Sequence, residues 1–349
     1  MATRCLISLG ANLGDRAHGL EQALQKLAAH PQIDVIRVSR TRETSPAGGP
    51  AGQARFLNAA AVLETSLSPQ ALLALLLQIE AEAGRTRDVR WGPRPLDLDL
   101  LLYEDAILAE PSLVAPHPRM AWRRFVLEPA AEIAPEMMHP GIGWSVARLL
   151  QHLNSTPYYA AIAGAIGVGK TELAKRLTEG NAWHRIDEQV DSQRLAAFYA
   201  NPASLAWPME LEFLRQRCRL LASDAIRWGN DPQPTVSDFW FDQSEAFARV
   251  WLPPERYREY CEHFGVARRT VVRPRLVVLL EARGEELRER VVRRGRPFER
   301  DLTAETLERI ARAIDRQTRQ PDVGPVLRIA GDCRDTVADE VSAAVVAMK

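Results

Sequence analysis

Through the first 153 residues, short apolar segments alternate with stretches whose apolar residues have the spacing of a helix. The apolar segments predict strands at 4–9, 34–38, 56–63 and 96–103. Apolar residues spaced three and four apart predict helices at 19–29 and 68–83, with Ser68 as the cap of the second and Pro69 in its first turn. Further loops and a short helix at 145–153 follow. The order strand-helix-strand-strand-helix-strand predicts an α+β ferredoxin-like sandwich.

The remaining chain has a different pattern. An apolar strand is expected at 158–163, followed by a glycine-rich turn and a helix that runs to about residue 177. Further strands are expected at 277–280 and 326–329, with helices between them. This alternation predicts an α/β P-loop kinase fold with a parallel sheet. We therefore expect two domains, 1–153 and 158–349, joined by a linker at 154–157.

Composition and charge narrow the class of protein. Of the 349 residues, 46% are hydrophobic and 26% charged, which is ordinary for a globular protein. Lys+Arg and Asp+Glu both number 45, and this balance argues against a general nucleic-acid binder. The four scattered cysteines favour neither disulfides nor a zinc site. We find no signal-peptide pattern and no apolar stretch of membrane-spanning length, so we expect a cytoplasmic protein without a membrane partner.

The densest candidate chemistry lies between Gly84 and Tyr103. Asp97 and Asp99 are two apart on an expected strand, so both side chains project from the same face. Paired carboxylates supply the oxygen ligands that Mg²⁺ prefers, and arginines provide donors for phosphate. The aspartates alone would suit a solvated strand face. The cluster of arginines and the Trp-Gly-Pro turn before them favour a phosphate site instead.

Six segments carry a resemblance to a known family. In chain order they read SLGANLGDR at 8–16, FLNAA at 56–60, GRTR at 84–87, RWGPRPLDLDLLLY at 90–103, PHPRM at 116–120 and RRFVLEPAAEIAP at 123–135. This order resembles hydroxymethyl-dihydropterin pyrophosphokinase, an enzyme of folate biosynthesis, over roughly residues 4–150. The resemblance implies that ATP is the co-substrate and that its diphosphate moves onto the hydroxymethyl group of a dihydropterin.

The resemblance implies roles for the polar residues that would meet ATP. Asp97 and Asp99 would bind two Mg²⁺ ions. Arginines would neutralise charge on the transferred diphosphate, with Arg85 also binding ATP, and a histidine would contact the phosphates; these residues are Arg85, Arg94, Arg123 and His117. Such a reaction depends on positioning and charge neutralisation more than on protein acids and bases.

The resemblance also implies a pterin site. The pterin ring would stack between Phe56 and Phe125, its polar edge would meet Asn58 and Thr44, and Trp91 would help to close the site. The glycine-rich loop at 44–52 and the basic loop at 84–91 are the expected lids.

Two positions depart from the family pattern. Leu77 stands where a glutamine often contacts adenine, with Gln78 one place displaced, and Asp88 stands where a lysine is frequent. Both changes concern nucleotide affinity.

A phosphate-loop pattern opens the second half. Residues 164–171, GAIGVGKT, follow an apolar strand and precede a helix, which is the context this pattern requires. The glycines Gly164, Gly167 and Gly169 allow backbone amides to hold phosphates, Lys170 reaches the terminal phosphates, and Thr171 binds one Mg²⁺. The alternative is a tight strand-to-helix turn without a ligand.

Segments beyond this loop resemble the deoxynucleoside kinases over about residues 158–345. They are the FYANP segment at 198–202, SDFWFD at 237–242 and RRGRPFE at 293–299. The resemblance implies that Glu188 takes a proton from the sugar hydroxyl, with Asp238 supporting the site, and that Glu299 holds the sugar. It further implies an arginine lid over ATP and a reader of the base edge; these residues are Arg290, Arg294, Arg296 and Glu210.

Three positions depart from this second pattern. Gln189 replaces a proline, Glu210 replaces a glutamine, and Gln243 replaces a lysine. Three interpretations therefore stand for the second half: a deoxynucleoside kinase, a nucleotide-binding scaffold without activity, or a kinase for a different small molecule. The arginine cluster also suits a solvated helix end. A homodimer through the second domain is a further expectation.

Overall fold

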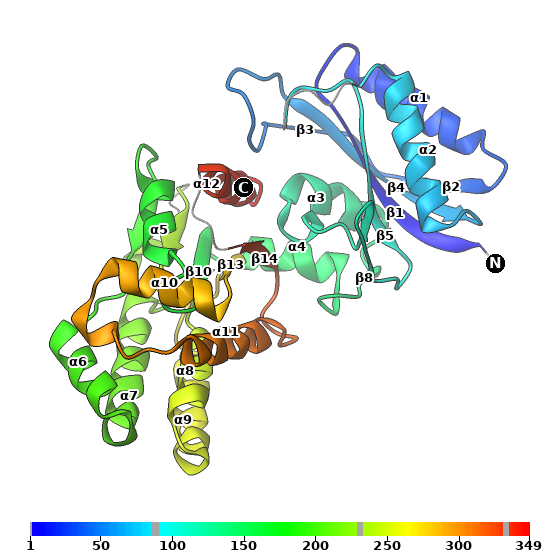
Figure 1. Ribbon diagram of the computed structural model, residues 1–349. Coiled ribbons are helices and arrows are strands. Elements are labelled where there is room, and N and C mark those ends of the chain that lie inside the picture. The colour runs from blue at the N-terminus through cyan, green and yellow to red at the C-terminus, as the bar shows by residue number, and fades with distance from the viewer. Residues whose placement is uncertain (1, 86–90, 229–232, 331–334) are drawn as a thin grey trace. The chain divides into compact units, whose positions relative to one another are not determined.

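The computed structural model describes residues 2–85, 91–228, 233–330 and 335–349 (Figure 1). Its contacts divide the chain into two compact units, Met1–Ser155 with Val346–Lys349, and Thr156–Val345. None of the helices in the described ranges is both long and apolar enough to cross a membrane.

The first unit is built on an antiparallel sheet with the strand order β2-β4-β1-β5, and β3 pairs with β4. Its strands are β1 (Thr3–Ala11), β2 (Ile33–Val38), β3 (Arg42–Thr44), β4 (Phe56–Thr65) and β5 (Asp97–Tyr103). Alternate residues of β1, such as Cys5, Ile7 and Leu9, belong to a buried core on one face. That face packs against two helices, α1 (Arg16–Ala28) and α2 (Pro69–Glu82) (Figure 1).

Caps explain where these helices begin. The Asp15 side chain accepts a hydrogen bond from the His18 N–H, so α1 starts at Arg16, three residues before the expected start. The Ser68 hydroxyl accepts from the Ala71 N–H, and Pro69 occupies the first turn of α2, as predicted.

The other face of the sheet meets α3 (Arg124–Ile133), in a region where we expected loops. Pro129 lies inside α3 and argues against a helix from sequence alone, but five of its ten residues are buried. The first unit also contains the following elements: β6 (Leu108–Glu110), β7 (Leu113–Ala115), a 3₁₀ turn (Met120–Trp122), β8 (Met138–His139), β9 (Trp144–Ser145) and α4 (Val146–Ser155). Helix α4 thus extends two residues into the segment expected as a linker. The last four residues of the chain group with this unit.

The second unit contains a parallel sheet with the strand order β11-β12-β10-β13-β14. Its strands are β10 (Tyr159–Ala163), β11 (His184–Ile186), β12 (Thr235–Ser237), β13 (Leu276–Glu281) and β14 (Val326–Ala330). Central β10 is buried at all five positions, as expected for a strand covered on both faces. The predicted parallel sheet is therefore confirmed.

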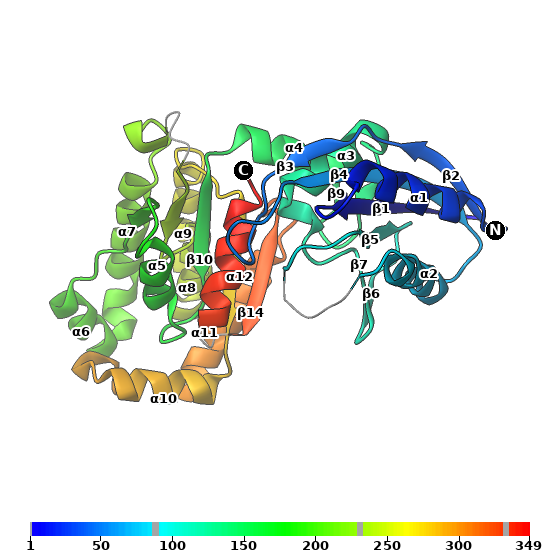
Figure 2. The same cartoon turned by 90° about the horizontal axis from the view of Figure 1, so that it is seen from above.

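Helices surround this sheet. They are α5 (Lys170–Thr178), α6 (Ser192–Ala200), α7 (Pro202–Leu220), α8 (Gln243–Trp251), α9 (Pro254–Ala267), α10 (Gly284–Arg294), α11 (Ala304–Thr318) and α12 (Asp335–Val346), with 3₁₀ turns at Ile226–Trp228 and Pro297–Glu299. Figure 2 shows α6 and α10 beyond the end of β10 from which the chain enters the 164–169 loop. Ligands of parallel α/β sheets bind at this carboxyl end of the strands, so both helices are placed to line a site.

Candidate active sites

The first candidate site lies on β5, beside the start of α3. Asp97 and Asp99 pair with Gly10 and Ser8 of β1, while Leu98 and Leu100 between and beyond them belong to the core. Both aspartates therefore face away from that core, as the two-residue spacing predicts.

Asp97 is held by two of the predicted arginines. Arg85 NH1 lies 2.5 Å from its Oδ1, and Arg94 NH1 lies 2.9 Å from its Oδ2. Burial opposes ionisation of Asp97, but the Arg94 and Arg85 guanidinium groups outweigh it and lower the pKa of this carboxyl. Asp97 is thus a charged group already matched by cations.

Asp99 has more distant charged partners than Asp97. Burial and the neighbouring charge of Asp97 raise its pKa to about 6. Arg123 NH1 and His117 Nε2 lie 4.0 Å and 3.9 Å from Asp99 Oδ2, too far for hydrogen bonds. Asp99 is therefore less firmly paired than Asp97.

His117 is a neutral donor. Its Nδ1 accepts a hydrogen bond from the Arg119 N–H at 3.2 Å, so the proton of the neutral ring resides on Nε2, which faces Asp99. Burial and the charges of Arg123 and Arg119 lower the pKa of His117 to about 3. An Nε2–H group in this position can donate to a phosphate oxygen.

The four residues predicted to hold the pterin lie next to this cluster. The Asn58 side-chain amide donates to Thr44 Oγ1 at 2.8 Å, across the β3–β4 pair. The Arg94 and Arg123 guanidinium carbons lie 5.7 Å and 5.5 Å from the ring centres of Phe56 and Phe125 respectively. Both rings are half-buried, so each keeps part of its surface free for stacking.

The two expected lid loops touch each other. Gln53 Nε2 donates to the carbonyl oxygens of Gly48 and Trp91, at 3.0 Å and 3.1 Å. Gly49 has φ +84°, and a Cβ there would lie 2.2 Å from Trp91 O. Only glycine fits this approach without displacement. The departure at Asp88 falls outside the described residues, and Leu77 is exposed on α2.

Sequence reasoning missed three residues of this site. Glu80 is 2% exposed, and its Oε1 accepts from the Leu98 N–H at 2.7 Å while also pairing with Arg85. Asn12 Oδ1 accepts from the Arg94 N–H at 2.7 Å. Arg119 lies 5.9 Å from the Trp91 ring centre. One feature of the sequence could have indicated Glu80: it places a carboxylate on an otherwise apolar face of a predicted helix.

The donor set is consistent with magnesium held mainly by a substrate. No group of three or more His, Cys, Asp or Glu side chains that could hold a metal occurs in the described part of the chain. Asp97 and Asp99 offer two carboxylates, and Mg²⁺ is commonly bound by one or two carboxylates together with phosphates and water. The site thus fits ions that arrive with ATP.

The second candidate site starts at the loop between β10 and α5. The predicted glycines Gly164, Gly167 and Gly169 have φ values of +143°, +83° and +105°. Lys170 Nζ donates to the carbonyl oxygens of Gly164 and Ala165 at 2.8 Å and 3.0 Å. Burial lowers the pKa of Lys170 to about 8.

Asp238 connects this loop to Glu188. Its Oδ2 accepts from Thr171 Oγ1 at 2.6 Å, and its Oδ1 accepts from the Glu188 N–H at 2.8 Å. The Glu188 carboxylate pairs with Arg217, whose NH2 lies 2.5 Å away. Arg217 is almost fully buried and also donates to Ser244 Oγ at 2.6 Å.

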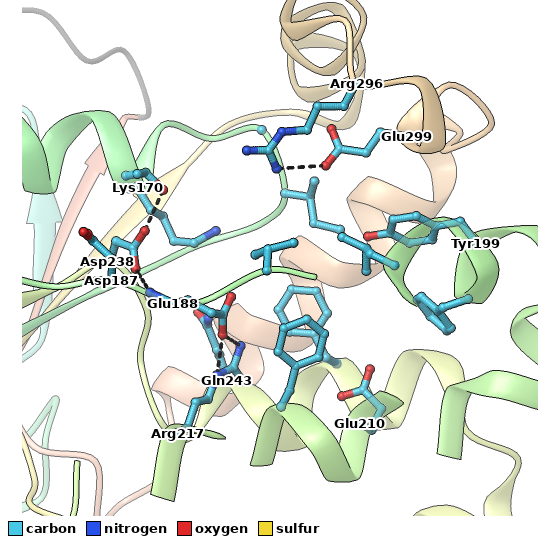
Figure 3. A pocket seen from close by; sticks show the side chains of 18 of the residues that line it. Lys170, Asp187, Glu188, Tyr199, Glu210, Arg217, Asp238, Gln243, Arg296 and Glu299 are labelled. Carbon is cyan, nitrogen blue, oxygen red and sulfur yellow. Dashed lines mark hydrogen bonds and ion pairs between the residues drawn. The ribbon is translucent and has the colours of Figure 1, made fainter. Parts of the chain in front are cut away.

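These residues surround a cavity of about 330 Å³ (Figure 3). Of the predicted residues it is lined by Gly167, Lys170, Thr171, Glu188, Glu210, Asp238, Arg294, Arg296 and Glu299. Gly164, Gly169 and Arg290 are not in its wall; Arg290 NH1 donates to Val168 O at 3.3 Å instead. One cavity thus gathers residues from the phosphate loop, α7 and the segment after α10.

Glu299 contacts the arginine lid rather than open space. Its Oε2 accepts from Arg294 Nε at 3.1 Å, and Arg296 NH1 lies 3.5 Å from its Oε1. Glu299 is 2% exposed. The arginine cluster is therefore partly ordered by an internal ion pair, which a solvated helix end does not require.

Several lining residues were missed by sequence reasoning. Arg217 gave no motif signal, since it is one arginine among several on α7. An aromatic wall also went unrecognised; its members are Phe198, Tyr199, Phe213, Phe247 and Trp251. Gln243, which replaces a lysine, is buried in this wall, and its Oε1 has no partner among the described residues.

Comparisons with known proteins match both halves. Residues 6–135 match the family model of 7,8-dihydro-6-hydroxymethylpterin-pyrophosphokinase, and residues 160–348 match that of deoxynucleoside kinase. The chain is 50% identical over 131 residues to 2-amino-4-hydroxy-6-hydroxymethyldihydropteridine pyrophosphokinase of Bacillus subtilis, covering 38% of this chain and 78% of the relative.

Two further proteins are similar over different parts of the chain. The Bifunctional protein FolKE of Lactococcus lactis is 33% identical over 74% of this chain and 68% of its own length. A solved structure of deoxyadenosine kinase from M. mycoides with bound dCTP covers 52% of this chain and 95% of its own, at 16% identity and a TM-score of 0.46. The chain therefore belongs to the 7,8-dihydro-6-hydroxymethylpterin-pyrophosphokinase family through residues 6–135 and to the deoxynucleoside kinase family through residues 160–348.

Proposed function

We propose that the first domain transfers diphosphate from ATP to 6-hydroxymethyl-7,8-dihydropterin and releases AMP, a step of folate biosynthesis. The observation that carries this proposal is the placement of Asp97 and Asp99 on one face of β5, opposite Arg85, Arg94 and Arg123. The substrate hydroxyl oxygen attacks the β-phosphorus, and the bond from that phosphorus to the AMP oxygen breaks.

The residues of the chain bind and orient the reactants in this reaction. Arg85, Arg94 and Arg123 neutralise charge on the diphosphate, and His117 donates its Nε2–H to a phosphate oxygen. Phe56 and Phe125 stack on the pterin, while Asn58 and Thr44 bind its polar edge. Trp91 and the 44–52 loop exclude water when the site closes.

Magnesium fits this proposal. Asp97 and Asp99 would hold two Mg²⁺ ions that arrive with ATP and neutralise its phosphates. Arg85 and Arg94, which occupy both oxygens of Asp97, would then turn to the phosphates.

For the second domain we propose phosphorylation of a deoxynucleoside with ATP. Lys170 and the loop of Gly164, Gly167 and Gly169 form a P-loop for the phosphates, and Thr171 with Asp238 would hold one Mg²⁺. Glu188 takes the proton of the attacking sugar hydroxyl. Arg290, Arg294 and Arg296 close over ATP, Glu299 binds the sugar or orders this lid, and Glu210 faces the base.

Four further assignments belong to this proposal. The antiparallel order β2-β4-β1-β5, with α1 and α2 on one face, supports a ferredoxin-like sandwich for the first domain. Domain limits at 1–153 and 158–349, with a linker at 154–157, stay a proposal; the contacts divide the chain after Ser155 and group Val346–Lys349 with the first unit. A cytoplasmic location and a homodimer through the second domain stay predictions.

Two assays on two variants test the proposal. Asp97→Ala should abolish AMP formation with the pterin and leave phosphorylation of deoxynucleosides intact. Lys170→Ala should abolish phosphorylation of deoxynucleosides and leave AMP formation with the pterin intact. Loss of both activities in either variant would contradict two separate sites. If the wild type binds ATP but converts none of the four deoxynucleosides, the second domain is a scaffold or a kinase for another small molecule.

A further inference from the structure

Glu210 is a buried carboxyl group that faces the cavity of the second domain without a protein partner. It is 3% exposed and lies in the cavity wall. Its oxygens form no hydrogen bond or ion pair with any residue in the described ranges. Figure 3 shows Glu210 well away from Lys170, with Glu188 between them. The phosphates bind near Lys170, so Glu210 lies at the opposite, base-binding end.

The neighbouring elements offer Glu210 no free cation. Arg217, on the same helix α7, is committed to Glu188 and Ser244. The other ionisable groups that interact with Glu210 are Glu188 ahead of α6, Tyr199 of α6 and Tyr260 of α9, and α8 contributes the neutral Ser244. Burial raises the pKa of Glu210 to about 8, with Glu188 adding to the shift and Arg217 opposing it. The pKa values of Tyr199 and Tyr260 are also raised, so neither tyrosine is ionised near neutral pH.

The protonation state of Glu210 decides which base edge it can bind. An ionised carboxylate has two acceptors and no donor, whereas a neutral carboxylic acid has one O–H donor beside one C=O acceptor. The neutral form therefore offers the donor-acceptor pair that a glutamine amide would offer at this position. The substitution of glutamine by glutamate keeps this pair as long as the proton is kept.

We propose that Glu210 binds the nucleobase as a neutral carboxylic acid and selects bases with a ring-nitrogen acceptor beside an exocyclic amine, namely adenine and cytosine. The inference rests on the proposed kinase function of the second domain. The O–H donates to the ring nitrogen, and the C=O accepts from the amine. Ring nitrogens of this kind are more basic than the carbonyl oxygens of thymine and guanine, so they are the better acceptors for an acid proton.

Ionisation of Glu210 reverses this preference. A carboxylate oxygen opposite a ring-nitrogen lone pair is repelled, and a buried pair of facing acceptors is costly. Deoxyadenosine and deoxycytidine should therefore bind more weakly as the pH rises. Guanine, with two adjacent N–H donors on one edge, tolerates the ionised form.

Equilibrium binding of each of the four deoxynucleosides, measured without ATP, tests the proposal on the full-length protein. The wild type should bind deoxyadenosine and deoxycytidine roughly tenfold more weakly at about pH 9 than at about pH 7. Glu210→Gln keeps a donor beside an acceptor at every pH and should bind them without this loss. Because Lys170 and every other ionisable group are unchanged in Glu210→Gln, the difference between the two proteins isolates Glu210.

Each outcome decides a separate point. The same pH dependence in both proteins, or tighter wild-type binding of thymidine or deoxyguanosine near neutral pH, would overturn the role of Glu210. The expected binding pattern without formation of any monophosphate would overturn the kinase function and leave the base recognition standing. If no deoxynucleoside binds either protein at any pH, both proposals fall.

Discussion

Asp97 in the first site and Glu210 in the second show how the surroundings set the charge of a carboxyl group. Burial acts against ionisation in both. Arg85 and Arg94 lie within 2.5–2.9 Å of Asp97 and lower its pKa, whereas no arginine of the described residues pairs with Glu210, whose pKa rises to about 8. Arginine contact and burial together decide which carboxyl group is charged near neutral pH.

The difference corresponds to two kinds of chemistry. A metal ligand for ATP must be ionised before the metal arrives, and its arginine partners can turn to the phosphates afterwards. A reader of the base edge needs a donor, which a carboxyl group has only while it is protonated. Glu188, like Asp97, is contacted directly by an arginine side chain, that of Arg217.

The largest effect is expected from removing a guanidinium group in the first site. Arg123 faces Asp99 and lies against the Phe125 ring. Arg123→Met should lower kcat of diphosphate transfer about 10²- to 10³-fold, as loss of a charge contact in a transition state typically does. AMP release at saturating substrates is the measurement.

Arg4→Met is the matched control for Arg123→Met. Arg4 is exposed and pairs with Glu64 at 3.3 Å on the sheet. Its loss should leave kcat unchanged, since exposed ion pairs contribute little. A small change in kcat for Arg123→Met, with a large rise in KM instead, would show that Arg123 binds ATP without acting in the transition state.

The next effect concerns the ion pair between Arg217 and Glu188 in the second site, because Glu188 is the proposed catalytic base. Arg217→Met leaves Glu188 partly buried and unpaired, which should cost about 3 kcal/mol in the free energy of unfolding. The double variant Arg217→Met/Glu188→Gln should recover most of this loss, as measured by denaturant unfolding. If the double variant is no more stable than the single one, packing of Arg217 rather than its charge is responsible.

Glu210→Gln should stabilise the protein in a pH-dependent manner. The folded-state pKa is raised from 4.5 to about 8, so the wild type loses free energy of unfolding as the pH rises from about 4.5 towards 8. Glutamine does not titrate. The variant should therefore be more stable than the wild type by several kcal/mol near pH 8, and equally stable near pH 4. An equal Tm difference at both pH values would show that Glu210 does not titrate in the folded protein.

The sequence indicated the centre of the first site because three of its residues lie close together along the chain. Asp97 and Asp99 share a strand face by simple alternation, and Arg94 lies three positions before Asp97. Glu80 could not be found this way, since its contact with Arg85 and the Leu98 N–H depends on how α2 lies on the sheet. Helix α3 was missed because Pro129 interrupts the local pattern, while burial of its apolar face overrides that penalty.

The second site was less accessible to sequence reasoning because its residues come from distant segments. Arg217 reaches Glu188 across 29 positions, and only the packing of α7 brings them together. The proposed role of Glu210 likewise depends on the fold and could not be predicted from the sequence. Read as a charged residue, glutamate in place of glutamine argues against base recognition. Because Glu210 is buried without a paired cation among the described residues, its carboxyl group keeps its proton near neutral pH and can donate a hydrogen bond. Burial is a property of the fold.

The smallest effect concerns the two loops that close the first site, which contact each other at Gly49 and Trp91. Gly49 approaches Trp91 O so closely that an alanine Cβ must displace one of the two loops. Gly49→Ala should raise KM for the pterin severalfold with little change in kcat, because neither Gly49 nor Trp91 is among the residues proposed to meet the transferred diphosphate. Gly52→Ala is the matched control: its φ is +79°, but no atom lies within 4 Å of its added Cβ. Equal effects of the two variants would attribute the change to backbone strain, whereas an effect of Gly49→Ala alone would attribute it to the contact with Trp91.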